Sequence, residues 1–324
     1  MKLFLTGASG FIGGAIAEDL SKKHRVFAMS RSENSDPGIA ASGATPVRSE
    51  LGAVRVEDLT DIDAIIHCAA YVNQWGQRED FMRVTVEGTR QLLEVARQAG
   101  VKRFVHMGTE AALFAGQPMV SIDESYPYPA RHKYLYSESK ALAEQLVLAA
   151  NIPGEFETIS LRPRLVWGPG DKTVLPEVIA MIQRGAFLWM DGGRHRTNTV
   201  HITNLVYATE LALTRGAGGR AYFITDDEIT TFRAFLTALV ATRGVTAPNK
   251  SMPGAIARGL SVIVEGVWAL LRLRKEPPLT RFAAAIMSSE CTIRIDRAKD
   301  DLGYRPRLSI AQGLEDLRAA AVCL

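Results

Sequence analysis

Short apolar runs alternate with longer amphipathic stretches over the first half of the chain. The short runs predict strands, and apolar residues three and four apart predict helices between them. Runs such as AIIH are too continuously apolar to alternate, which is typical of strands buried on both faces of a parallel sheet. The pattern therefore predicts a doubly wound α/β fold. Strands are expected at 2–6, 25–29, 63–69, 103–107 and 156–162, and helices at about 12–22, 78–99 and 135–150.

The rhythm changes after Pro163. A helix near 174–184 and a turn rich in glycine and arginine come first, and a helix near 203–214 with a strand at 220–225 indicates a return to the sheet. The rest is mainly helical, and SIAQ at 309–312 is typical of a capping box that opens the last helix. We therefore expect a sheet domain over 1–164, a smaller helical cap over 165–200 and 228–324, and a return to the sheet over 201–227.

The longest apolar stretch, 254–274, contains polar residues at spacings of three, four and seven: Arg258, Ser261, Glu265 and Arg272. At those spacings they form one polar stripe on a helix whose other faces are apolar. Charges inside a membrane span are rare and costly, so we do not read the stretch as a span. Two interpretations stay open: a helix packed within the protein over an apolar pocket, and a helix resting peripherally on a membrane surface.

Composition and charge exclude several classes of function. A chain of 324 residues that is 47% hydrophobic can bury a large core, as expected for a globular enzyme. A formal charge of +3 with interleaved acids and bases argues against nucleic acid as a partner. Cys68, Cys291 and Cys323 are far apart, so we expect neither a disulfide framework nor a metal site. Because MKLFLTG runs straight into a strand and a glycine turn, we read the protein as cytoplasmic.

The segment TGASGFIGG, residues 6–14, follows the first predicted strand and opens the first predicted helix. Its glycines permit a tight turn and close approach of the backbone to a pyrophosphate, while the helix N-terminus offers free N–H donors. The strand before and the helix after are the context that this motif needs. The segment therefore predicts a Rossmann-type dinucleotide-binding domain, whose phosphate loop comprises Gly7, Ser9, Gly10, Phe11, Ile12 and Gly13.

The end of the second predicted strand bears on which nicotinamide dinucleotide binds. An acid there would bind the ribose 2′-OH, and a basic residue would accommodate a 2′-phosphate. The chain reads AMSRSENS, which places Ser30, Arg31 and Ser32 at this position with no acid before Glu33. NADP(H) is favoured. The alternative, in which Arg31 is a solvated residue at the strand end and NAD(H) binds, stays open.

The segment YLYSESK, residues 134–140, carries the candidate acid/base group. Residues four apart share a helix face, so Tyr136 pairs with Lys140 and Tyr134 pairs with Glu138. A neighbouring ammonium group favours a phenolate, so we expect the pKa of Tyr136 to lie below its usual value. Such a phenol could exchange a proton near neutral pH, while Tyr134 more simply packs or lines an entrance.

Thr109 follows the strand predicted at 103–107, one element before this helix. Active groups in such sheets gather outside the carboxyl ends of the strands, so Thr109 can supply a hydroxyl near the phenol. A hydroxyl that hydrogen-bonds a substrate oxygen, a phenol that exchanges a proton and a lysine that keeps the phenol acidic suit carbonyl and alcohol interconversion. The nicotinamide cofactor would carry the hydride.

Together TGASGFIG, Thr109 and YSESK resemble the extended short-chain dehydrogenase/reductase superfamily, over essentially the whole chain. The resemblance implies that Tyr136 is the acid/base, that Lys140 also holds the nicotinamide ribose and that Thr109 orients the substrate. It also implies a homodimer through helices near 80–98 and 135–150. Further implied cofactor contacts are the Glu50-Leu51 pair at the adenine, the residues of HCAA that line the cofactor, and a proline: Glu50, Leu51, Ala69, Ala70 and Pro163.

Two departures separate this chain from the nucleotide-sugar epimerases and dehydratases of that superfamily. Leu165 stands where RxxNxYGP has asparagine, and Glu110-Ala111 follows Thr109 where dehydratases have Asp-Glu. Thr85 also replaces the asparagine of an NVxGT pattern, which leaves the usual structural role of that asparagine open. LRPRLVWGPGD, EPPLTRF and DRAKDDLGYRPRLSIAQGL instead resemble the 3β-hydroxysteroid dehydrogenase-like branch.

That branch includes sterol-4-carboxylate 3-dehydrogenases and 2-alkyl-3-oxoalkanoate reductases, which implies a lipophilic and sometimes carboxylated substrate. Arg164, Arg194 and Arg196 are candidates for holding a carboxylate, although an ordinary surface or cap ion pair is the favoured interpretation of each one. The leading hypothesis is an NADP(H)-dependent oxidoreductase that interconverts a secondary alcohol and a ketone. A nucleotide-sugar epimerase or dehydratase with tightly held NAD, and a non-catalytic cofactor sensor, are the alternatives.

Overall fold

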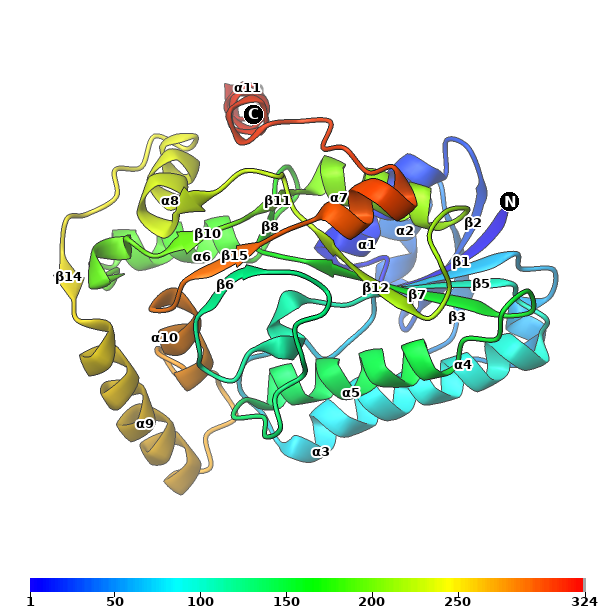
Figure 1. Cartoon of the computed structure of the whole chain (residues 1–324), viewed down its shortest axis with the longest axis horizontal. Helices are drawn as coiled ribbons and strands as arrows, with labels where there is room; N and C mark the ends of the chain where they lie inside the picture. The colour runs from blue at the N-terminus through cyan, green and yellow to red at the C-terminus, as the bar shows by residue number, and fades with distance from the viewer. Residues whose placement is uncertain (323–324) are drawn as a thin grey trace.

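The computed structural model describes residues 1–322, and a seven-stranded sheet lies at its centre (Figure 1). The strand order is β12-β7-β5-β4-β1-β2-β3, and every neighbouring pair is parallel. The predicted doubly wound α/β fold is confirmed. The strands are β1 (Lys2–Thr6), β2 (Arg25–Ser30), β3 (Thr45–Arg48), β4 (Ala64–His67), β5 (Arg103–Met107), β7 (Glu157–Pro163) and β12 (Arg220–Ile224).

Helices cover both faces of this sheet (Figure 1). On one face α1 (Phe11–Leu20) packs against α7 (Ile202–Ala212), with α2 (Asp36–Ala41) beside them. On the other face α4 (Gly88–Gln98) packs against α5 (Leu135–Ala149). The helix predicted at 78–99 is in fact α3 (Arg78–Phe81), a π-helical segment (Met82–Glu87) and then α4. Hydrophobic periodicity does not distinguish such a widened turn from regular α-helix.

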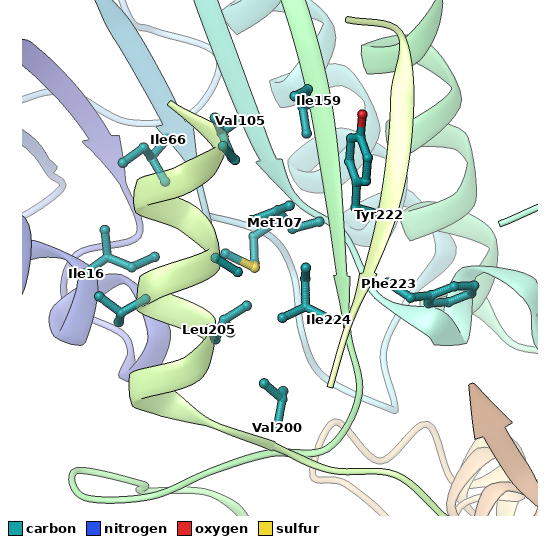
Figure 2. Packing of buried hydrophobic residues seen from close by; sticks show 14 of the residues in the cluster. Ile16, Ile66, Val105, Met107, Ile159, Val200, Leu205, Tyr222, Phe223 and Ile224 are labelled. Atoms are coloured by element: carbon teal, nitrogen blue, oxygen red, sulfur yellow. The ribbon is translucent and has the colours of Figure 1, made fainter. Parts of the chain in front are cut away.

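The direction in which strands are added reverses between β1 and β4, and ligands bind at such a switch point, outside the carboxyl ends of the strands. Figure 2 shows the apolar core beneath it, where Ile66 of β4 and Met107 of β5 pack toward Leu205 of α7. The buried strands hold the loops at their carboxyl ends on a rigid base.

The strand predicted at 220–225 is β12, which pairs with β7 at the sheet edge. The sequence does not predict the four-stranded sheet β13-β10-β15-β6, because its strands have only two to four residues. The predicted capping box is confirmed: Gln312 N donates to Ser309 Oγ at 3.2 Å, and Ser309 N donates to Gln312 Oε1 at 2.9 Å. The remaining elements are β6 (Met119–Ile122), β8 (Val166–Trp167), α6 (Val174–Gln183), β9 (Trp189–Met190), β10 (Arg196–Thr197), β11 (Val200–His201), β13 (Thr230–Thr231), α8 (Phe232–Ala241), β14 (Ser251–Met252), α9 (Gly254–Leu270), α10 (Arg281–Met287), β15 (Cys291–Ile293) and α11 (Ile310–Val322).

Within α9 the predicted polar stripe lies toward α10, where Ser261 is buried, whereas Arg272 lies beyond the end of α9 and is exposed. Arg258 Nη1 donates to Ser288 Oγ at 2.6 Å, and Arg281 N donates to Glu265 Oε1, also at 2.6 Å. Both bonds tie α9 to α10, while the apolar side of α9 faces outward. Within residues 1–322, no helix combines the length and the apolar character that crossing a bilayer requires. Cys68 and Cys291 are free thiols, and Cys323 lies outside the described residues.

Candidate active site

The glycine loop forms a surface that no larger residue could make. Gly7 has a φ of 79°, and a Cβ there would lie 2.9 Å from Ala69 N. A Cβ on Gly13 would lie 2.2 Å from the carbonyl oxygen of Gly7, so the loop and α1 touch backbone to backbone. Gly10 is the N-cap of α1. The loop thus presents bare backbone and a helix N-terminus at the switch point, which fits a dinucleotide pyrophosphate.

Other residues of the predicted phosphate loop lie around this turn. Ser9 is exposed, whereas Phe11 and Ile12 are partly buried and pack against the main core. Ala69 and Ala70, directly across from Gly7, are also partly buried. These residues therefore lie at the same edge of the sheet, and their contact with the cofactor stays a prediction.

A buried network that the sequence analysis missed supports that edge. Thr6 Oγ1 lies 2.8 Å from His67 Nδ1 and accepts from Ala69 N at 3.1 Å, and His67 Nε2 lies 2.9 Å from Thr89 Oγ1. Burial, with a smaller contribution from the Lys140 ammonium, lowers the pKa of His67 to about 3, so the ring is neutral. The network joins β1, β4 and α4, and no local spacing in the sequence signals it.

Thr85 shows what replaces the missing asparagine. It is buried, and its Oγ1 accepts a hydrogen bond from Tyr71 N at 3.0 Å. Its carbonyl oxygen accepts from Thr89 Oγ1 at 2.6 Å. The shorter side chain therefore fixes the loop after β4 to the π-helical segment, so this departure from the family pattern keeps a structural function.

The end of β2 lies beside two charged residues that the sequence analysis did not consider, Asp36 and Arg48. Ser30 is buried and donates to Asp36 Oδ1 at 2.5 Å, and Asp36 also pairs with Arg48 at 2.5 Å. Arg31 and Ser32 are exposed. Asp36, six residues after Ser30, is the acid that the sequence reading overlooked, although its carboxylate is already engaged by Arg48. Arg48, on β3, is a second cation at this end of the sheet.

The predicted adenine contacts lie further along the same edge. Glu50 is exposed, and Leu51 is partly buried against an apolar cluster that includes Leu92 and Leu93 of α4. A Cβ on Gly88 would lie 3.0 Å from Leu51 Cβ, so Leu51 packs closely on the start of α4.

Tyr136, Thr109 and Lys140 lie where α5 passes the end of β5. Tyr136 is partly buried at the start of α5, and the Thr109 hydroxyl lies beside its phenol. The expected lowering of the Tyr136 pKa is wrong for this structure. Burial of the phenol, and to a smaller extent the Glu110 carboxylate, raise the pKa of Tyr136 to about 12. The Thr109 hydroxyl acts in the opposite direction and lowers this pKa.

Lys140 explains why its expected effect on the phenol is absent. The side chain is buried, and its ammonium group donates to Met107 O at 2.6 Å, at the end of β5. Burial lowers the pKa of Lys140 to about 8, against the raising effects of Glu144 and Cys68. The ammonium is therefore held by the backbone of β5, and the nearby Glu144 charge favours its charged form.

Glu110 is a further buried residue of this site. Thr109 Oγ1 donates to Glu110 Oε2 at 2.9 Å and accepts from Ala111 N at 3.2 Å. The other Glu110 oxygen pairs with Arg164, which also donates to Thr197 Oγ1 at 3.0 Å.

These contacts change the expectation for the three arginines. Arg164 is only 2% exposed, and its pairing with Glu110 contradicts a free role for it in binding a substrate carboxylate. Arg196 pairs with Glu290 at 2.7 Å on the surface. Arg194 is exposed and donates to Asp191 O at 3.1 Å. Pro163, which precedes Arg164 and is the last residue of β7, is also buried.

An aromatic wall borders Tyr136. Phe282, on α10, packs edge-on against Tyr136 and Tyr134, each with ring centroids 5.5 Å apart, and against Phe114 at 6.2 Å. Phe114 and Tyr134 are stacked at 5.7 Å. The wall is apolar on the side that α10 presents to the phenol. Sequence spacing gave no sign of it, because the rings come from three separate segments.

Comparison with known proteins defines the class of protein: the chain is an NAD(P)-dependent oxidoreductase of the extended short-chain dehydrogenase/reductase type. Its family follows from comparison with known proteins. The model of the 3-beta hydroxysteroid dehydrogenase/isomerase family matches residues 4–253, and the chain belongs to that family.

Curated relatives extend over almost the whole chain. A 4-hydroxy-2-methyl-3-oxo-4-farnesyl-3,4-dihydroquinoline-1-oxide ketoreductase of Stigmatella aurantiaca is 38% identical, over 99% of this chain and 96% of the relative. A 2-alkyl-3-oxoalkanoate reductase of Stenotrophomonas maltophilia is 33% identical, over 99% of both chains. Among solved structures, UDP-glucuronic acid 4-epimerase from Bacillus cereus in complex with NAD has a TM-score of 0.76 at 18% identity, over 99% of this chain and 100% of the other. That likeness establishes the fold alone.

Proposed function

We propose that the chain is an NADP(H)-preferring enzyme that interconverts a ketone and a secondary alcohol on a lipophilic substrate. The observation that carries the proposal is the position of Tyr136, with a hydroxyl on one side and the aromatic wall of Phe282 on the other. Both relatives described above are named as reductases of oxo compounds with alkyl or farnesyl groups. A 2-alkyl-3-oxo acid, or a steroid or sterol with a 3-ketone or 3β-hydroxyl group, fits this wall.

In ketone reduction, Tyr136 gives its proton to the carbonyl oxygen. A phenol with a pKa of about 12 is protonated at neutral pH, so the acid form is the resting form. Thr109 lies beside the phenol, and its hydroxyl, turned from Glu110, donates to the carbonyl oxygen and polarises it. Lys140 holds the cofactor ribose from its place beside Met107 O, and the glycine loop holds the pyrophosphate. When bound, the nicotinamide supplies the hydride.

The preference for NADP(H) rests on the two cations at the ends of β2 and β3. Arg31 is exposed, and Arg48 is anchored to Asp36, so a 2′-phosphate would meet positive charge. We expect Arg31→Ala to raise the KM for NADPH about tenfold and leave the KM for NADH unchanged, since a charged contact is worth about 1.5 kcal/mol. Arg25→Ala, at the other end of β2, is the control. An equal change for both cofactors would favour NAD(H).

The alternative of a nucleotide-sugar epimerase has less support. Leu165 has a φ of 42°, a left-handed conformation that asparagine adopts easily and a branched apolar residue does not. Its side chain, between β7 and β8, packs against an apolar cluster that includes Trp167 and Phe235. The backbone at this position would thus suit asparagine, but an apolar side chain stands there.

Substrate tests separate the two functions. The purified chain is given NADPH with a steroid 3-ketone, a 2-alkyl-3-oxo acid or a nucleotide sugar, and the loss of reduced nicotinamide is followed. We expect turnover of one lipophilic ketone. Conversion of the sugar without net cofactor oxidation, together with no reaction of either ketone, would support the epimerase.

We further propose the organisation of the molecule around this reaction. Residues 1–164 and the returning 201–227 form the cofactor domain, and 165–200 with 228–324 form the substrate-binding cap, which is supported by Phe282 reaching Tyr136 from α10. A cytoplasmic homodimer through α4 and α5 stays a prediction, and sedimentation velocity tests it. We also propose peripheral membrane contact through 254–274.

A further inference from the structure

The outward side of α9 is strongly apolar. Of twelve exposed large apolar residues among the described residues, eight lie within 256–273. Five of them are spaced alternately by four and three, so they form one stripe opposite the polar stripe that faces α10. Exposed patches of this kind mark interaction sites. The stripe consists of Ile256, Leu260, Ile263, Val267 and Leu270.

The charges at the end of this stripe indicate the partner. Arg272, Arg274 and Lys275 are exposed immediately after the last turn of α9, between and beside the exposed side chains of Leu271 and Leu273. The acid of α9, Glu265, accepts from Arg281 N on the protein side, and one acid, Glu276, follows the three cations. An apolar stripe bordered by cations suits the surface of an anionic lipid bilayer.

Helices α9 and α10, with the turn that joins them, form a helical hairpin, and this hairpin reaches the active site through α10. Phe282 is 8% exposed, and its ring packs on Tyr136. The hairpin is attached to the loop after β4 by two hydrogen bonds: Thr280 Oγ1 donates to Gln74 Oε1 at 2.7 Å, and Trp75 Nε1 donates to Leu273 O at 3.0 Å. This loop is also the one that begins with the predicted cofactor contacts. Figure 1 shows α9 and α10 together at the periphery, with α9 outermost.

We propose that α9 and α10 form a lid over Tyr136, that α9 docks on an anionic bilayer, and that docking moves Phe282 away from the phenol so that a lipophilic ketone enters from the bilayer. The proposal rests on the proposed function for the nature of the substrate. The bonds from Arg258 to Ser288 and from Arg281 to Glu265 join the two helices, so a displacement of α9 carries α10 with it. A bilayer shifts the lid because it contacts α9 better in the open position.

The test uses the full chain and compares the reduction of two ketones that differ in chain length. A short-chain, water-soluble analogue of the preferred ketone and a long-chain ketone are each reduced with NADPH, without lipid, with phosphatidylcholine vesicles and with vesicles containing phosphatidylserine. Vesicle flotation measures binding in parallel. We expect phosphatidylserine vesicles to raise kcat/KM for both ketones about tenfold, a typical coupling between two sites.

Three variants locate the effect. Ile263→Gln with Leu270→Gln should abolish flotation and stimulation, whereas Ile229→Gln, an exposed apolar residue outside the hairpin, should keep both. Gln74→Ala with Trp75→Phe removes the two hydrogen bonds to the hairpin. This last variant should reduce the short-chain ketone about tenfold faster without lipid, because the lid opens more often.

Each outcome decides between the claims. Flotation without stimulation would overturn the lid. Absence of flotation, with an oligomer that Leu270→Gln dissociates, would assign the stripe to a second copy of the chain. If the short-chain ketone is not reduced under any condition while NADPH binds, the proposed function fails, and the lipid comparison is then moot.

Discussion

Replacing Glu144 by glutamine should weaken the fold and shift the titration of Lys140 together. The Glu144 side chain, on α5, is fully buried, and its carboxylate bonds Arg162 at 2.7 Å, Ser160 at 2.6 Å and Tyr128 at 2.6 Å. Arg162 is only 3% exposed. Glutamine keeps the size of the side chain but leaves the guanidinium buried without a counter-charge.

The expected loss of stability follows from this geometry. Removing one partner of a buried ion pair costs about 3–5 kcal/mol. For 324 residues, the entropy of unfolding is about 0.7 kcal/mol/K near the midpoint, so a loss of about 4 kcal/mol lowers Tm by about 6 °C. The free energy of unfolding from urea titration should fall by the same amount as the thermal data imply.

The effect on Lys140 gives a second readout. Burial lowers the pKa of Lys140 to about 8, and the Glu144 charge opposes that lowering. Without the carboxylate the pKa of Lys140 falls further, so less of the ammonium form remains at pH 7.5. If the charge of Lys140 holds the cofactor ribose, the alkaline limb of kcat/KM moves to lower pH in Glu144→Gln.

Two further proteins make the result interpretable. Asp296→Asn breaks a surface pair whose side chains are more than half exposed, and should change the free energy of unfolding by less than about 1 kcal/mol. Glu144→Gln with Arg162→Gln removes both charges and should regain much of the loss. A Tm for Glu144→Gln within about 1 °C of that of Asp296→Asn would refute the reasoning.

Other consequences concern burial and the glycine loop. In the unfolded chain His67 is protonated below about pH 6.5, whereas in the folded chain its pKa is about 3. The free energy of unfolding, measured with urea, should therefore fall by up to about 5 kcal/mol as the pH drops from about 6.5 to about 3. The fall should be smaller in His67→Asn. Lys140 has a pKa of about 10.5 in the unfolded chain and about 8 in the folded chain. The free energy of unfolding should therefore rise by about 3 kcal/mol as the pH increases from about 8 to about 10.5, and Lys140→Met should lack this rise. Gly13→Ala forces the backbone apart and should weaken NADPH binding more than tenfold by calorimetry, whereas Gly38→Ala, with open space around it, should not.

Local pattern was enough to predict the large sheet and the glycine loop. β4 is continuously apolar because it is buried on both faces, and that burial appears directly in the sequence as AIIH. Gly7 and Gly13 are needed by backbone contacts within a few residues and with the adjacent strand, so their spacing carries the information. The strands of the small second sheet are too short to carry any such period.

Other features depend on contacts between distant segments. Glu110 and Arg164 are 54 residues apart, and only the alignment of β5 and β7 brings them together. The pKa of Tyr136 depends on that burial and on the Glu110 charge, so pairing with Lys140 along the helix predicted the wrong direction. For α9, the sequence predicts a polar stripe, but which side of the helix faces the protein is decided by α10.

The measurement that tests the account most directly is the reduction of the preferred lipophilic ketone by NADPH in Tyr136→Phe and in Tyr134→Phe. The two tyrosines lie two residues apart, and only Tyr136 has its phenol on Thr109. We expect Tyr136→Phe to lose about 10²–10⁴-fold in kcat with unchanged NADPH binding and Tm, and Tyr134→Phe to keep kcat within about threefold. Full activity in Tyr136→Phe, or the larger loss in Tyr134→Phe, would contradict the account.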